Sequence, residues 1–217
     1  DARRGKAERQ RQVAGAPHLV EYYHEVGDPY SHLMAQVLPE FCERYDIQLQ
    51  THLVSPPPNW AAPDRARLEA YARRDAELLA RRPSLDFSDP GTQPSRDAIA
   101  SANAALLGAV DSETFLRRAY KIGQNLWRGE QVEREGADHV AAEDVLKASA
   151  EKRDTQGHYL GGTLFYAGEW YWGVDRLHFL EQRLKDLGAA TDVSDAPIFA
   201  PPTIPSSSAS KPLETPP

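Results

Sequence analysis

The chain has 217 residues, of which 41% are hydrophobic, and this length is sufficient for one sizeable core. Its net charge of −7 argues against a general nucleic-acid-binding protein, because such proteins gather basic residues on one face. No apolar run approaches the ~20 residues that span a bilayer, and no signal peptide is visible. We therefore expect no membrane partner and a cytoplasmic location.

Cysteine and histidine usage limits the chemistry further. The single cysteine, Cys42, excludes an internal disulfide and a Cys-x-x-Cys redox centre. Cys42 falls on the apolar face of a predicted helix, which indicates an unreactive buried thiol. The seven histidines show no metal-ligand spacing, so no metal site is predicted.

The N-terminal part of the chain predicts a leader, a strand and a helix. Residues 1–16 are polar and basic, which is typical of an exposed and partly helical leader. An apolar strand from Leu19 to Tyr23 follows, and the segment from Gly27 to Leu33 then opens a helix with Asp28 as N-cap. Pro39 lies inside this helix and is expected to kink it.

The start of this helix is the first candidate site. Free N–H groups and the helix dipole favour a negative charge there. Asp28 is either a helix cap only, or it lines a ligand site together with Tyr30 and Ser31. His24 and His52 would approach Asp28 if the first two strands are parallel neighbours, which would give an acid–base pair; the alternative is histidines scattered in solvent.

A second strand and a long helical segment are predicted next. Alternation from Ile47 to Val54 indicates the strand, and residues 64–152 are mostly helical, with two helices at Glu113–Trp127 and Ala141–Lys152. An earlier helix carries an apolar stripe made of Leu68, Tyr71, Ala72, Leu78 and Leu79. Asp75 lies within that stripe and is expected to be an inward carboxylate paired with an arginine or a loop N–H.

The stretch from Gly161 to Leu177 predicts a hairpin that leads into a helix. A tight turn at residues 167–169 joins two strands, and the helix begins at Asp175. The aromatic run at 170–172 is expected in the hairpin core rather than in a ligand site. The helix carries a leucine stripe and ends before Gly188, where a left-handed residue is expected.

Residues 189–217 differ in composition, because they hold seven of the 17 prolines and a serine-rich run. Such a segment is expected to be a linker or an extended arm. Its only bulky apolar pair, Ile198 and Phe199, is expected to dock on the domain.

Two motifs resemble the DsbA-like thioredoxin superfamily, in particular its branch of 2-hydroxychromene-2-carboxylate isomerases and kappa-class glutathione transferases. The segment from Asp28 to Leu33 reads Asp-Pro-Tyr-Ser-His-Leu, where that branch typically has Ser-Pro-Tyr-Ser-Tyr-Leu. The segment from Tyr171 to Leu177 agrees closely with the branch's aromatic-Trp-Gly-x-Asp-Arg-Leu motif.

The resemblance covers most of residues 18–187 and implies an α/β protein with a thioredoxin-like fold and an inserted helical domain. Residues 17–187 would then form the domain. Its thioredoxin part would comprise residues 17–56 and 157–187, and residues 64–152 would be the helical insertion.

The resemblance also implies glutathione as a cofactor. Asp28, Tyr30 and Ser31 would lie at the reacting centre. The cofactor-binding residues would be Gly161 and Gly162, beside the cysteinyl backbone, and Val174 and Asp175, at the γ-glutamyl end.

Two departures from the family pattern affect that site. The family serine that holds the glutathione sulfur falls on Asp28, whose carboxylate would repel a thiolate. The family cis-proline falls on Gly162, for which a trans peptide bond is expected.

Two functions remain open from the sequence. One is a glutathione-dependent isomerase or transferase that acts on a small molecule. Such an enzyme would belong to an oxidoreductase family by name but would lack redox chemistry. The intact Val174–Arg176 segment favours it. The other is a non-catalytic thioredoxin-fold binding domain, which could be one half of a tandem DsbA-like protein. Asp28 and Gly162 favour this second function. In either case we expect the C-terminal segment to contact either a second copy of the chain, in a homodimer, or an adjacent domain.

Overall fold

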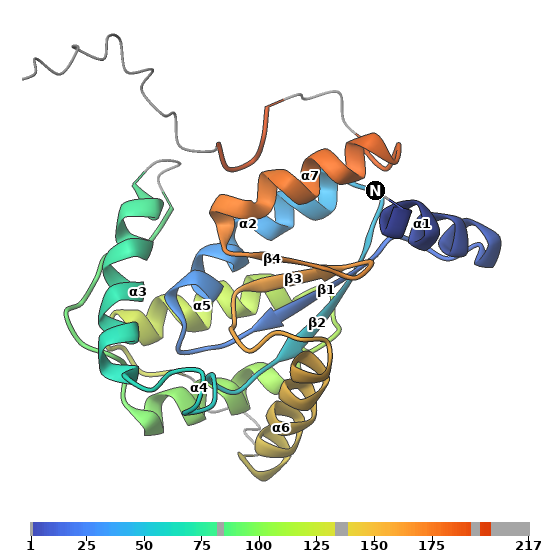
Figure 1. Cartoon of the computed structure of the whole chain (residues 1–217). Coiled ribbons are helices and arrows are strands. Elements are labelled where there is room, and N and C mark those ends of the chain that lie inside the picture. Colours follow the sequence, from blue (N-terminus) through green and yellow to red (C-terminus); the bar gives the residue numbers. More distant parts are fainter. Residues whose placement is uncertain (1, 82–84, 133–138, 192–195, 201–217) are drawn as a thin grey trace, which may run out of the picture.

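A computed structural model describes residues 2–81, 85–132, 139–191 and 196–200 of the chain (Figure 1). Four strands form one sheet in the order β2-β1-β3-β4. The strands are β1 (Leu19–His24), β2 (Gln48–Leu53), β3 (Thr163–Tyr166) and β4 (Glu169–Trp172). β1 pairs with β2 in parallel, and β3 runs antiparallel to both β1 and β4. The mixed sheet confirms the predicted α/β class. The parallel pairing of β1 and β2 meets the condition under which His24 and His52 were expected to approach Asp28.

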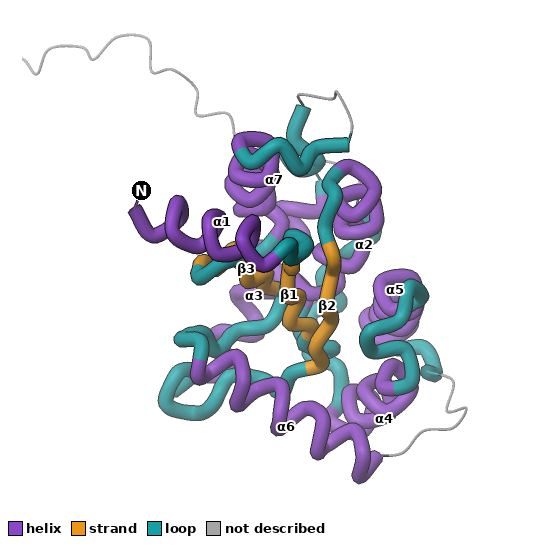
Figure 2. Tube along the Cα trace, turned by 90° about the vertical axis from the view of Figure 1, so that its right-hand side faces the viewer, coloured by secondary structure: helices purple, strands orange, loops and turns teal. Residues whose placement is uncertain are grey.

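The two faces of the sheet are covered differently. Helices α2 (Pro29–Arg44) and α7 (Leu177–Asp186) lie together over one face, and α6 (His139–Thr155) lies on the other side (Figures 1 and 2). Alternate residues of β1 pack on the two faces, because successive side chains of a strand point in opposite directions. Tyr22 bonds to the backbone of Ser31 on α2, whereas Tyr23 bonds to Gln156 just after α6.

The main core lies between the sheet and the helices α2 and α7. The three leucines at the start of the α7 stripe, Leu177, Leu180 and Leu184, are completely buried, as the leucine spacing predicted. Gly188 follows α7 with a φ of +74°, which also agrees with the predicted helix end. α2 continues without interruption across Pro39 to Arg44, so the kink at Pro39 stays a prediction.

The hairpin has the geometry that its sequence predicted. Ala167 and Gly168 connect β3 to β4 with φ values of +46° and +86°, the signature of a tight hairpin turn in which both central residues are left-handed. The aromatic run of β4 is only partly core. Tyr171 is buried, but Trp172 keeps 39% of its surface exposed.

The helical segment between β2 and β3 contains α3 (Arg65–Ala80), α4 (Arg96–Leu107), α5 (Phe115–Trp127) and α6. The predicted apolar stripe on α3 is wrong in part, since Tyr71 and Leu78 are each 58% exposed. Small residues form the buried face instead, namely Ala72, Ala76 and Ala80. Small side chains allow α3 to pack closely against α2, so the bulky residues turn outward.

Both ends of the chain contact the domain. α1 (Ala2–Ala14) has no buried residue, and Arg4 attaches it to Glu169 with an ion pair of 2.8 Å. At the other end Phe199 is completely buried, and the Ile198 N–H donates to the carboxylate of Glu181. This confirms the predicted docking of Ile198 and Phe199. Residues 192–195 and 201–217 of the predicted linker lie outside the described residues.

None of the helices in the described ranges combines the length and the apolar character needed to cross a membrane.

Candidate functional site

The turn between β1 and α2 closes on itself through Asp28. One carboxylate oxygen of Asp28 accepts the Tyr30 N–H at 3.3 Å, and the other accepts the Ser31 N–H at 2.8 Å and the Ser31 hydroxyl at 2.9 Å. The His32 N–H donates to the Asp28 carbonyl, and Pro29 has no N–H. Asp28 is therefore the N-cap, as predicted. It also occupies the donors that would otherwise receive an external anion.

Ser31 supports this turn from inside the protein. Its side chain is completely buried, and its hydroxyl also accepts the backbone N–H of Glu25 at 3.1 Å. Ser31 therefore connects Glu25 to Asp28 and presents no free hydroxyl to a ligand.

Tyr30 points from α2 toward α3. Its hydroxyl donates to the carboxylate of Asp75 at 2.8 Å, and its ring packs edge-on against Trp172 at 5.3 Å between ring centres. Asp75 is therefore an inward carboxylate, but its partner is a tyrosine and not the predicted arginine or loop N–H. Burial and the neighbouring Asp75 raise the pKa of Tyr30, so its hydroxyl stays protonated.

A small cavity of about 80 Å³ opens beside this turn. Glu25, which directly follows β1, lines it together with Asp28, Tyr30, Gly161 and Trp172. Sequence reasoning missed Glu25. The signal was the pair of acidic residues, Glu25 and Asp28, three positions apart in one strand-to-helix turn.

The two carboxyl groups share one environment. Burial raises the pKa of Glu25, and the nearby charge of Asp28 raises it further. Burial also raises the pKa of Asp28, against the hydrogen bonds from Ser31 and Tyr30, which lower it. Because those donors favour the ionised form of Asp28, and no side-chain donor to Glu25 is seen among the described residues, the negative charge belongs on Asp28 and the proton on Glu25.

The two glycines before β3 pack directly against these carboxyl-bearing residues. A Cβ atom on Gly161 would lie 2.4 Å from the Cβ of Glu25, and one on Gly162 would lie 3.0 Å from a carboxylate oxygen of Asp28. Gly162 also has a φ of +60°, which strains any other residue. No cis peptide bond occurs in the described ranges, so Gly162 has the predicted trans bond.

The segment predicted to hold the far end of glutathione lies next to Gly162 but outside the cavity. The Gly173 N–H donates to the Gly162 carbonyl at 2.9 Å. Val174 is completely buried, so it offers no atom to a ligand in this conformation. Asp175 is half-buried and pairs with Arg176 at 3.4 Å. Of the predicted site residues, the cavity thus brings together Asp28, Tyr30 and Gly161.

The predicted histidine–aspartate pair does not form. His24 is buried and bonds to the Tyr22 hydroxyl at 2.9 Å, and His52 bonds to Glu21 at 3.2 Å. His52 lies opposite Tyr23 in the parallel register and so belongs to the face covered by α6. The alternative of solvated histidines is also wrong for these two, since each finds a polar partner within the sheet.

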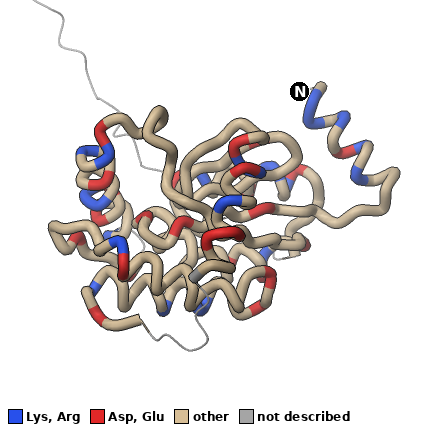
Figure 3. Tube along the Cα trace, turned by 90° about the horizontal axis from the view of Figure 1, so that it is seen from below, with Lys and Arg blue, Asp and Glu red and all other residues tan. Residues whose placement is uncertain are grey.

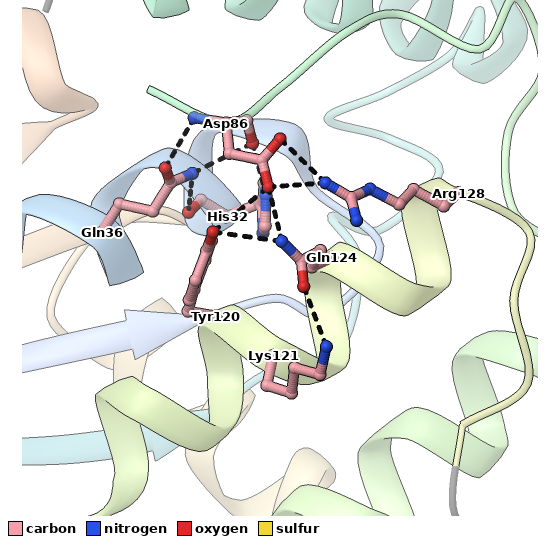
Figure 4. Close-up of polar contacts among 7 residues, drawn as sticks. All are labelled: His32, Gln36, Asp86, Tyr120, Lys121, Gln124 and Arg128. Carbon is pink, nitrogen blue, oxygen red and sulfur yellow. Dashed lines mark hydrogen bonds and ion pairs between the residues drawn. The ribbon is translucent and has the colours of Figure 1, made fainter. Parts of the chain in front are cut away.

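A polar cluster around Asp86 fastens the helical segment to α2 (Figure 4). The backbone carbonyl of Asp86 bonds to a ring nitrogen of His32 at 2.9 Å. Its carboxylate accepts bonds from three α5-side residues, Tyr120, Gln124 and Arg128. Gln124 and the other donors lower the pKa of Asp86. The cluster is well placed to keep the loop after α3 in position beside the site.

Cys42 lies outside the cavity, and it is the only cysteine of the chain. Burial raises the pKa of Cys42 to about 11, so it stays a thiol at neutral pH. Within the described ranges, no group of three or more His, Cys, Asp or Glu side chains is placed to hold a metal ion.

Asp28→Ala should lower the free energy of unfolding by about 0.5–2 kcal/mol, because it removes the N-cap of α2. Urea denaturation monitored by circular dichroism measures the change. Ser95→Ala, which removes the cap of α4, is the matched control and should have an effect of similar size. An unchanged denaturation midpoint in Asp28→Ala would contradict the capping role.

The raised pKa of Glu25 also predicts how stability depends on pH. A carboxyl group whose pKa is higher in the folded state stabilises the protein at low pH, and this contribution is lost as the pH rises above its ordinary pKa of 4.5. Glu25→Gln should therefore gain stability relative to the wild type as the pH rises, by up to about 1.4 kcal/mol per pH unit. Denaturation of both proteins between pH 5 and 9 tests this, and a constant difference would refute it.

A comparison with solved structures supports this architecture, whereas two comparisons of the sequence found no match. No protein-family model matches the chain, and no curated protein sequence matches it significantly. A solved structure of a 2-hydroxychromene-2-carboxylate isomerase is similar, with a TM-score of 0.52 and 19% sequence identity, over 78% of this chain and 96% of that one. The chain therefore has the fold of that isomerase, the DsbA-like thioredoxin fold that the two motifs indicated.

Proposed function

We propose that the chain is a small-molecule enzyme of the isomerase type that works by proton transfer at Glu25 and Asp28, without a glutathione thiolate at the start of α2. The observation that carries this proposal is the single cavity that holds both carboxyl groups. The pKa values of both carboxyl groups are raised toward neutral pH, which suits general acid–base catalysis.

The two carboxyl groups divide the work. Protonated Glu25 donates its proton to the substrate, and the ionised carboxylate of Asp28 accepts a proton from another position of the substrate. The substrate gains one proton and loses one, as an isomerisation requires. Glu25 regains its proton from Asp28 or from water. Tyr30 and Trp172 would form the wall against which the substrate packs.

The same geometry argues against a thiolate. In a glutathione site of the family type, the sulfur would need free donors at the helix N-terminus, but those of Tyr30 and Ser31 are bonded to Asp28. The carboxylate would also repel the sulfur. Asp28→Ser should therefore strengthen glutathione binding over the wild type, and calorimetric titration of both proteins measures it.

The enzyme assay uses 2-hydroxychromene-2-carboxylate, the compound in the name of the similar solved protein. Its conversion is followed by absorbance, with and without added glutathione. The proposal predicts turnover without any thiol. Turnover that strictly requires glutathione would contradict it and restore the glutathione-dependent mechanism.

The second candidate is a non-catalytic binding domain. Ser31 and Val174 stand at positions that the family presents to its cofactor, but in this chain both are completely buried. Because neither is free to contact a ligand, their burial favours this candidate. This candidate predicts no turnover in the assay, so the wild type and Glu25→Gln should be equally inactive.

A further inference from the structure

A larger groove of about 770 Å³ adjoins the cavity. Its walls come from the loop after β2, the start of α3, α4 and the N-terminal half of α6. Helices α4 and α6 lie side by side at the lower edge of the molecule in Figure 2. Groove and cavity share Arg65, Glu69 and Gln93 in their walls, together with Pro56 and Ile99. A volume in this range is ordinary for a small-molecule site.

Four charged side chains that line the groove, Arg65, Glu69, Arg96 and Glu143, form no ion pair among the described residues. Arg65 donates only to neutral oxygens, those of Pro57 and Asn59. Within the described ranges, Arg96, Glu69 and Glu143 likewise form no ion pair. Nearby Arg73, by contrast, pairs with Asp89 at 3.0 Å. The groove therefore offers two positive and two negative groups, none of which is held in an ion pair.

Asn103 supplies an independent observation. This α4 residue lines the groove with only 8% of its surface exposed, and its side-chain oxygen is buried without a hydrogen-bond partner among the described residues. An unpartnered buried acceptor destabilises the protein, and a donor that binds to it removes this cost. We therefore expect a bound ligand to donate an N–H or O–H to the side-chain oxygen of Asn103.

We propose that this groove is a second ligand site that binds a zwitterionic amino compound, an amino acid or a short peptide. The carboxylate of the ligand would face Arg65 and Arg96, and its ammonium group would face Glu69 or Glu143. An N–H of the ligand would donate to Asn103. Ile99 and Leu146, which also line the groove, would cover its apolar part. This site goes beyond the proposed proton transfer and does not depend on it.

The test is a binding measurement on the full chain labelled with ¹⁵N. A panel of the free amino acids and simple dipeptides is titrated, and each member is paired with its N-acetylated, amidated form, which lacks both charges. The side-chain amide signal of Asn103 is assigned by its loss in Asn103→Leu. We expect members of the zwitterionic panel to shift this signal and their blocked forms to leave it unchanged.

Variants then test the contacts. Asn103→Leu should weaken binding at least tenfold, and Glu143→Gln should weaken it as well. Asp144→Asn changes the neighbouring exposed carboxylate of α6, which does not line the groove, and should leave binding unchanged. The proposal is overturned if no zwitterion shifts the Asn103 signal, or if the blocked forms bind equally well. Binding that persists in Glu25→Gln would show that the site is separate from the proton-transfer pair.

Discussion

Glu25→Gln should lower the turnover rate by about 10²–10⁴-fold, the range that a positioned general acid contributes. Glutamine keeps the size and polarity of the side chain but has no proton of suitable acidity to donate. The fold should survive, because the substitution removes a carboxyl group whose ionisation burial opposes. Steady-state kinetics with 2-hydroxychromene-2-carboxylate measure the effect on kcat.

Glu69→Gln is the matched control for this prediction. Glu69 lines the same cavity from α3, but it lies outside the turn that connects Glu25 to Asp28. Its substitution should change KM more than kcat. Equal losses of kcat in Glu25→Gln and Glu69→Gln would show that the cavity needs negative charge in general and would contradict the specific role of Glu25.

Phe199→Ala should lower the free energy of unfolding by about 3–5 kcal/mol, the usual cost of deleting a buried aromatic ring. Phe199 is completely buried although it lies in a proline-rich segment close to the C-terminal end. A loss of this size is a large part of the total stability of a domain. Urea denaturation with far-UV circular dichroism measures it.

Phe179→Ala is the control for Phe199→Ala, because the ring of Phe179 on α7 is 52% exposed. It should change the free energy of unfolding by no more than about 0.5 kcal/mol. A loss in Phe199→Ala as small as that expected for Phe179→Ala would contradict the place of Phe199 in the core.

Local sequence patterns predicted the parts of the fold that local chemistry determines. Asp28 and Pro29 marked the start of α2, because an N-cap and an N-terminal proline act within one helical turn. The turn at Ala167 and Gly168 and the helix end at Gly188 follow from backbone preferences of single residues. The leucine spacing of α7 identified its buried face for the same reason.

The remaining features depend on contacts between segments far apart in the sequence. The buried face of α3 is made of alanines because α2 lies close to it. The spacing of bulky residues along α3 does not reveal how close a neighbouring helix lies. His52 pairs with Glu21 across two strands, 31 positions apart, and so turns away from Asp28. Burial is the main cause of the raised pKa of Glu25, and Gly161, which lies far along the chain, packs directly against the Glu25 side chain. The spacing of Glu25 and Asp28 was visible in the sequence, but the burial of their carboxyl groups was not.

The most direct test of the carboxyl pair is the titration of Glu25 itself, followed by ¹³C NMR of its side-chain carboxyl carbon in the wild type and in Asp28→Asn. The account predicts that Glu25 titrates above the ordinary range of a glutamate in the wild type. In Asp28→Asn its pKa should fall, because the neighbouring negative charge that raises it is gone, although burial still holds it above the ordinary value. An ordinary pKa in the wild type, or a raised pKa that Asp28→Asn leaves unchanged, would contradict the interaction between protonated Glu25 and ionised Asp28 on which the proposed function rests.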